Sequence, residues 1–117
     1  MTQPPPTLFV AILSYVQPLT EVDAAGADHV AWLQRGYADG VFLASGRRLP
    51  RTGGIILAKG ASFEEVEARM RTDPLQERGL ATVEIFPFQT NFATEAMRTA
   101  IAAAAADQTV KPEQAHD

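Results

Sequence analysis

The chain has 117 residues, of which 46% are hydrophobic, and it carries a formal net charge of -4 with no cysteine. This length suits one domain that buries roughly two thirds of the surface exposed by its unfolded form. The acidic balance excludes nucleic acid as an expected partner, because phosphate backbones would be repelled. The absence of cysteine excludes thiol nucleophiles, thiolate zinc sites and disulfides.

The N-terminal segment lacks the features of a targeting or membrane segment. No Lys or Arg precedes the apolar run from Leu8 to Val16, and this run is too short to span a bilayer. We therefore expect a cytoplasmic protein that does not associate with membranes.

A strand and a helix are predicted at the start of the chain. Residues 8–16 are almost all apolar and rich in β-formers, which is typical of a strand covered on both faces. Apolar residues at helical spacing then predict one helix, with Thr20 and Asp23 as a weak N-cap signal and Gly40 as the stop.

A hairpin and a second helix follow. The short apolar segments 41–45 and 54–58 are separated by Arg, Pro and Gly residues, which predicts a β-hairpin. Ser62 and Glu65 form a capping box for the second helix, and Pro74 must end that helix at or before the preceding residue.

Residues 81–88 predict a last strand, in which Pro87 favours a sheet edge or the end of the strand. The resulting order, βαββαβ, indicates an α+β ferredoxin-like fold with an antiparallel sheet and both helices on one face. The strands are apolar on both sides, so the other face needs a cover. A second copy of the chain is the simplest way to cover this apolar face, and we predict a homodimer packed through its sheet faces.

The predicted domain spans residues 1–92. Residues 93–106 form a helical extension, because an alanine-rich run from Thr94 has high helix propensity. Residues 107–117 are polar and are predicted to be a disordered tail.

His29 is the main candidate for chemistry. It lies in the apolar stripe of the first helix, and imidazole changes charge near neutral pH. A general base needs a partner that fixes its tautomer, and Asp73, before Pro74, is the candidate partner. The structural alternatives are a core histidine bonded to a backbone carbonyl and an aspartate that caps a turn.

Ser45, Gly46 and Arg47 are candidate substrate-binding residues at the end of the second strand. Glycine there lets backbone approach a ligand, and serine can orient it. With Arg48 and Arg51, Arg47 forms a basic loop that can hold a substrate carboxylate, although such a cluster is usually a solvated hairpin tip.

No metal site or cofactor is predicted, because the domain has one histidine and none of the usual ligand spacings. Trp32 and Tyr37 are expected to pack, with Trp32 flanking the apolar face or lining a dimer contact.

Four segments together resemble the YciI-like (YCII-related) family over about residues 8 to 92: residues 28–33, residues 40–46, Asp73-Pro74-Leu75, and Gly79-Leu80 before the strand that ends in Pro87-Phe88. The resemblance implies a dimeric α+β barrel of ferredoxin-like subunits. It also implies that His29 and Asp73 form an active-site dyad. Relatives often carry an arginine where this chain has Gly26, and a proline where it has Arg47.

Two functions follow as hypotheses. The first is a cofactor-independent lyase or isomerase, similar to a dehydrochlorinase or a muconolactone isomerase, in which His29 and Asp73 perform general acid/base chemistry on a small oxygenated cyclic substrate. The second is a non-catalytic dimeric small-molecule binding or accessory module, in which the two residues are structural.

Overall fold

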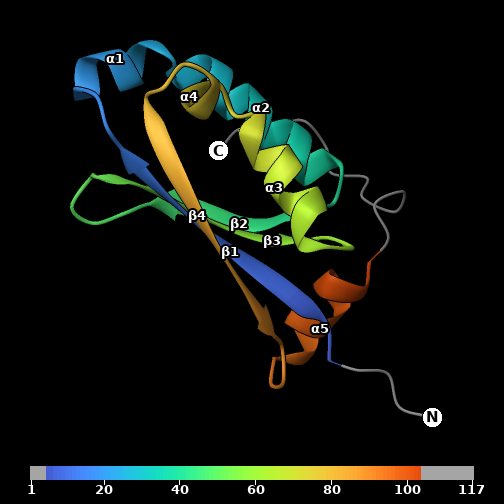
Figure 1. Ribbon diagram of the computed structural model, residues 1–117. Coiled ribbons are helices and arrows are strands. Elements are labelled where there is room, and N and C mark those ends of the chain that lie inside the picture. Colours follow the sequence, from blue (N-terminus) through green and yellow to red (C-terminus); the bar gives the residue numbers. More distant parts are fainter. Residues whose placement is uncertain (1–4, 104–117) are drawn as a thin grey trace.

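The computed structural model describes residues 5–103 and contains a four-stranded antiparallel sheet of order β2-β3-β1-β4. Helices α2 and α3 lie side by side over one face of this sheet (Figure 1). The ferredoxin-like arrangement predicted from the sequence is therefore confirmed. In chain order the elements are β1 (Thr7–Tyr15), α1 (Leu19–Ala24), α2 (Gly26–Ala38), β2 (Phe42–Arg47), β3 (Gly53–Lys59), α3 (Phe63–Arg71), α4 (Pro74–Glu77), β4 (Ala81–Gln89) and α5 (Glu95–Ala102).

Strand β1 is central, which explains its apolar character on both faces. It pairs with β3 on one side and with β4 on the other. Phe9 belongs to the main core together with Trp32 of α2. Val10 lies on the opposite face, in register with Leu57 and Phe86. The core is thus enclosed between the sheet and the helices, while the second face carries its own apolar side chains.

The single first helix predicted from the sequence is wrong, because the segment forms two helices. Ala25 separates α1 from α2 with φ -94° and ψ 1°. Val22 of α1 packs with Ala25 and Leu75 in a second, smaller core. Apolar spacing does not reveal the interruption, and glycine at position 26 has low helix propensity.

The predicted N-cap at Thr20 is also wrong. Helix α1 begins at Leu19, and Pro18 precedes it without a side-chain capping bond. Asp23 bonds to the β2–β3 hairpin instead, as described below.

The β2–β3 hairpin forms as predicted, and one glycine in it is a steric requirement. A Cβ on Gly53 would lie 1.8 Å from the carbonyl oxygen of Leu13. Strands β1 and β3 therefore approach each other closely at the end of the sheet beside α2.

The second predicted helix is confirmed, and a short helix follows it. Ser62 accepts a 3.1 Å hydrogen bond from the Glu65 backbone N–H at the start of α3, which ends at Arg71. Pro74 then opens α4, and Asp73 is its N-cap. Asp73 therefore caps a short helix, where the structural alternative considered from the sequence was a capped turn.

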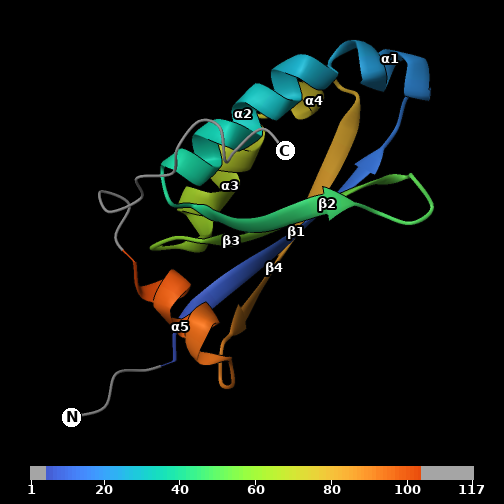
Figure 2. The same cartoon turned by 180° about the vertical axis from the view of Figure 1, so that it is seen from behind.

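Helix α5 lies on the sheet face away from α2 and α3 (Figures 1 and 2). Lys59 is opposite Leu8 in the register, on that second face. Its Nζ donates to the carbonyl oxygens of Ala100 and Ile101, each at 3.1 Å, and of Ala103. The rest of the predicted extension and the predicted tail lie outside the described residues. No helix within residues 5–103 is long and apolar enough to cross a membrane.

Candidate active site

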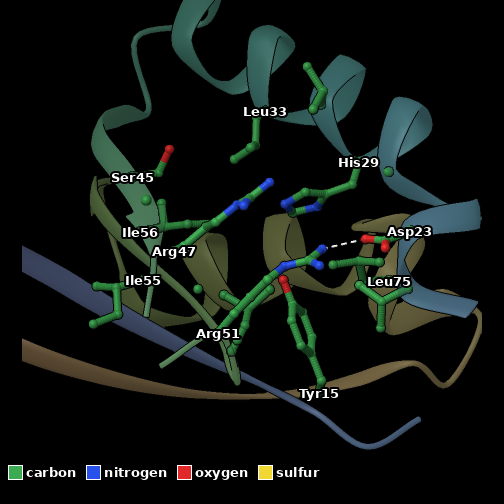
Figure 3. A pocket seen from close by; sticks show the side chains of 17 residues that line it. Tyr15, Asp23, His29, Leu33, Ser45, Arg47, Arg51, Ile55, Ile56 and Leu75 are labelled. Atoms are coloured by element: carbon green, nitrogen blue, oxygen red, sulfur yellow. Dashed lines mark hydrogen bonds and ion pairs between the residues drawn. The ribbon is translucent and has the colours of Figure 1, made fainter. Parts of the chain in front are cut away.

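A cavity of about 300 Å³ lies between α2 and the adjoining ends of β2 and β3 (Figure 3). This volume is at the lower end of the range for small-molecule sites, roughly 300–1,000 Å³. Helices α1 and α4 complete its wall, which is largely apolar. The aliphatic part of the lining comes from Leu13, Val22, Val30, Leu33, Ile56 and Leu75.

His29 joins this cavity to a buried carboxylate. Its Nδ1 lies 2.8 Å from Asp73 Oδ1, and its side chain is 21% exposed. Because a carboxylate only accepts hydrogen bonds, Nδ1 carries the proton in this contact, and in a neutral imidazole Nε2 is then the acceptor. The geometry therefore provides an oriented imidazole at the cavity wall.

Asp73 has a second role in the structure. The residue is 1% exposed, and its Oδ1 also accepts a 3.0 Å hydrogen bond from the Leu75 backbone N–H. Its other oxygen, Oδ2, is buried without a hydrogen-bond partner among the described residues. The same oxygen atom of Asp73 therefore accepts the capping bond and the bond from His29, so the two interpretations of this residue are compatible.

Trp32 is a site residue that sequence reasoning missed. It is 2% exposed and stacks on His29, with ring centroids 5.8 Å apart. Its Nε1 donates a 2.8 Å hydrogen bond to Thr72 Oγ1. Trp32 packs, as expected, but it belongs to the core rather than to the rim of the apolar face. The sequence does contain a hint of this role: Trp32 follows His29 by three residues, about one helical turn, and Thr72 directly precedes Asp73.

Ser45, Gly46 and Arg47 all line the cavity with His29, whereas Asp73 reaches it only through His29. The Ser45 hydroxyl lies 2.7 Å from the Tyr37 hydroxyl of α2. A Cβ on Gly46 would meet nothing within 4 Å. Because Gly46 pairs with Ile55, this Cβ would lie on the sheet face away from the cavity, and Gly46 lines the cavity through its backbone.

The arginine loop is divided among different contacts. Arg51 forms an ion pair with Asp23 in the cavity wall (Figure 3), and its Cζ lies 6.0 Å from the ring centroid of Tyr15. The hydrogen bond from Arg51 lowers the pKa of Asp23, and the same bond raises the pKa of Arg51. Arg48 donates to Ser14 Oγ at 3.0 Å instead.

The described residues contain no group of three or more His, Asp or Glu side chains placed to hold a metal ion. The polar groups of the cavity are instead an imidazole, hydroxyls, guanidinium groups and one carboxylate. Groups of these kinds can transfer protons and bind anions.

The family model of the YCII-related domain matches residues 8–89. The chain belongs to the YCII-related family. This match confirms the resemblance inferred from the sequence motifs. No curated protein sequence matches the chain.

One solved structure supports the assignment of the fold, and two others are more distantly similar. The YCII-related chain is similar to 5-chloro-2-hydroxyhydroquinone dehydrochlorinase (TftG) from Burkholderia phenoliruptrix in complex with 2,5-dihydroxybenzoquinone. The two structures align with a TM-score of 0.61 and 18% sequence identity. The alignment covers 70% of this chain and 93% of the dehydrochlorinase chain. Two structures of SnoaB, a cofactor-independent oxygenase from Streptomyces nogalater, are each 15% identical to this chain, with TM-scores of 0.44 and 0.45. The first alignment covers 76% of this chain and 96% of the SnoaB chain, and the second covers 78% and 98%.

Proposed function

We propose that this YCII-related protein is a lyase or isomerase that uses His29 as general base and general acid on a small oxygenated cyclic substrate. One observation carries the proposal: the imidazole lines a cavity while its Nδ1 is bonded to a carboxylate that is 1% exposed. An imidazole held in this way accepts a proton at Nε2 without any cofactor.

Asp73 stabilises the charge that forms during proton transfer. When Nε2 takes a proton from a C–H or O–H group of the substrate, the imidazolium lies 2.8 Å from the Asp73 carboxylate. The protein shields this ion pair from water, so the attraction is stronger than in solution. In an isomerisation the imidazolium returns the proton to another atom. In an elimination the C–H electron pair forms the double bond, the leaving group departs with its own pair, and the proton passes to solvent.

The expected substrate class comes from the cavity and from the structural neighbour. The cavity has room for a small molecule, and its walls are mainly apolar. The neighbouring dehydrochlorinase holds 2,5-dihydroxybenzoquinone, an oxygenated six-membered ring. Ser45, Gly46 and Arg47 would bind such a ring at the strand end, opposite His29.

Proton abstraction can be tested without knowledge of the product. Cyclic enols, hydroxyquinones and lactones are incubated with the protein in D2O, and exchange of their carbon-bound protons is followed by NMR. We expect the His29→Gln variant to lose roughly 100- to 10,000-fold in exchange rate, and Asp73→Asn to lose activity as well.

Asp28→Asn is the matched control. Asp28 precedes His29 on α2, but its carboxylate pairs with Arg78 at 2.6 Å and does not line the cavity. This variant should exchange at the wild-type rate. Equal rates in the wild type and in His29→Gln would contradict the catalytic role.

The second candidate function is a non-catalytic binding module, and the hydrogen bond from Leu75 to Asp73 favours it. If His29 and Asp73 are structural, His29→Gln should lower the free energy of unfolding. A catalytic His29 predicts unchanged or increased stability, because active-site groups are often not optimised for folding. Urea unfolding of the wild type and His29→Gln distinguishes these outcomes.

The uncovered sheet face supports a homodimer. Ile55, Phe86 and Phe88 lie on this face and are 41%, 49% and 44% exposed. Helix α5 binds to Lys59 of β3 at the Leu8 end of the face, whereas Phe86 and Phe88 lie on β4 and leave that part of the face open. A two-fold axis through this open part would bury the aromatic side chains of both copies.

A further inference from the structure

We infer that the substrate of this cavity is a small cyclic monoanion whose carboxylate binds Arg47. This inference rests on the proposed function of the same cavity and adds the chemical class of the ligand. It also assigns separate tasks to the arginines of the β2–β3 hairpin.

The charges on the cavity wall leave one positive charge without a partner. Asp23, Arg47 and Arg51 line the cavity, and Asp23 forms an ion pair with Arg51. Within residues 5–103, the Arg47 side chain makes no hydrogen bond or ion pair, although its charge helps the closer Arg51 to lower the pKa of Asp23. Because the remaining wall is largely apolar, this charge is a strong local attraction for one anionic group.

The backbone register directs Arg47 into the cavity and Arg48 away from it. Arg47 is opposite Gly54, and in Figure 3 its guanidinium group points toward the side of the cavity that His29 lines. Arg48 donates to Ser14 Oγ at 3.0 Å, outside the cavity lining. Two adjacent arginines of the same charge thus have different surroundings, and this provides a matched control.

A carboxylate fits Arg47 better than a phosphate does. The planar guanidinium group donates two parallel hydrogen bonds to a carboxylate, and one positive charge balances one negative charge. A phosphate dianion would need a second free cation, and Arg51 is already paired with Asp23.

The position of Arg47 also relates binding to the proposed chemistry. A carboxylate bound to Arg47 would place the attached ring in the cavity that His29 also lines, where Nε2 of the neutral imidazole can accept a proton. Negative charge that spreads toward a conjugated carboxylate, as the ring loses a proton, would be stabilised by the same guanidinium group.

Asp23 limits the negative charge that the cavity accepts. Its carboxylate neutralises Arg51 and lies in the same wall as the proposed anion site. Asp23→Asn would remove that charge and release Arg51. We therefore expect this variant to bind carboxylates several-fold more tightly than the wild type does.

The test compares salicylate with salicylamide, which share a ring but differ in charge, by NMR titration of the purified protein. The wild type should bind salicylate at least about 10-fold more tightly than salicylamide. Arg47→Gln should weaken salicylate binding by about 10- to 100-fold and remove the preference. Arg48→Gln should behave as the wild type.

The inference is overturned if the wild type shows no preference for salicylate, including the case in which neither compound binds, or if Arg47→Gln keeps the preference. The two proposals fail separately. A carboxylate preference that is lost in Arg47→Gln, combined with wild-type proton exchange in His29→Gln, would support the binding site and reject the reaction.

Discussion

Trp32 Nε1 donates a 2.8 Å hydrogen bond to Oγ1 of Thr72, the residue directly before Asp73. The same indole ring stacks on His29 with an interplanar angle of 25°. One side chain therefore contacts the histidine directly and holds the turn that carries its aspartate partner. The geometry of the His29–Asp73 pair depends on a residue that takes no part in proton transfer.

Replacement of Trp32 by Phe tests this dependence. The variant keeps an aromatic ring but loses the hydrogen bond, and we expect the free energy of unfolding to fall by about 1–3 kcal/mol. The Nδ1 proton signal of His29 should broaden in the NMR spectrum as the contact with Asp73 loosens. Thr72→Ser retains the hydroxyl and should match the wild type. An unchanged signal in Trp32→Phe would show that the indole does not position His29.

Gly53 provides a test of the close approach between β1 and β3. A Cβ at this position would lie 1.8 Å from the Leu13 carbonyl oxygen, so Gly53→Ala must separate the strands. We expect a loss of about 2–4 kcal/mol in urea unfolding. Gly46→Ala is the control, because its Cβ would meet nothing within 4 Å. Equal stability of the two variants would contradict the steric account.

The Asp23–Arg51 pair predicts a pH dependence of stability. The hydrogen bond from Arg51 holds the pKa of Asp23 below its ordinary value, so the ionised form stabilises the folded state. This contribution is fully present above the unfolded-state pKa of about 4 and is lost as the pH falls through the lower folded-state pKa. The difference in urea midpoint between the wild type and Asp23→Asn should therefore shrink toward zero below about pH 4. A difference that is independent of pH would refute this role.

Lys59 is expected to hold α5 on the sheet. Lys59→Met keeps the aliphatic stem but removes the ammonium group that donates to three carbonyl oxygens at the end of the helix. Amide hydrogen exchange within α5 should accelerate by at least about 10-fold, while β1 stays protected. Lys59→Arg retains the charge and should exchange more slowly than Lys59→Met. Wild-type protection in the methionine variant would mean that other contacts hold the helix.

Phe86 tests the proposed dimer. It lies on the uncovered sheet face opposite Val10 and is 49% exposed. Phe86→Glu would bury a charge between two copies, so we expect light scattering to report a monomer where the wild type is a dimer. Leu49→Glu, at a hairpin position that is 93% exposed, should leave the dimer intact. A monomeric wild type would reject the proposal directly.

Much of the fold was predictable, because strand and helix periodicity depends on local burial. The four predicted strands and the helix that Ser62 caps are present in the structure. The break at Ala25 was missed, because apolar residues keep the same spacing on both sides of it. The cytoplasmic location and the domain limits inferred from the sequence stay predictions.

The candidate site was predictable in its residues but not in its contacts. His29 and Asp73 are separated by 44 positions, so their contact depends on how α2 crosses the end of α3. The pairing was proposed because a general base needs a partner, and the family resemblance then implied it as well. The bond between Trp32 and Thr72 depends on the same crossing, and the only signal for it in the sequence is their position near His29 and Asp73. The roles of Arg47, Arg48 and Arg51 were indistinguishable in the sequence, because they depend on the strand register and on the position of Asp23.

A single atom, Asp73 Oδ1, accepts hydrogen bonds from both His29 and the peptide nitrogen of Leu75. A change in the electron density of that oxygen changes the strength of both hydrogen bonds. The Leu75 amide thus acts as a built-in spectroscopic probe, and its nitrogen chemical shift should follow the ionisation of the imidazole on the other side of the carboxylate.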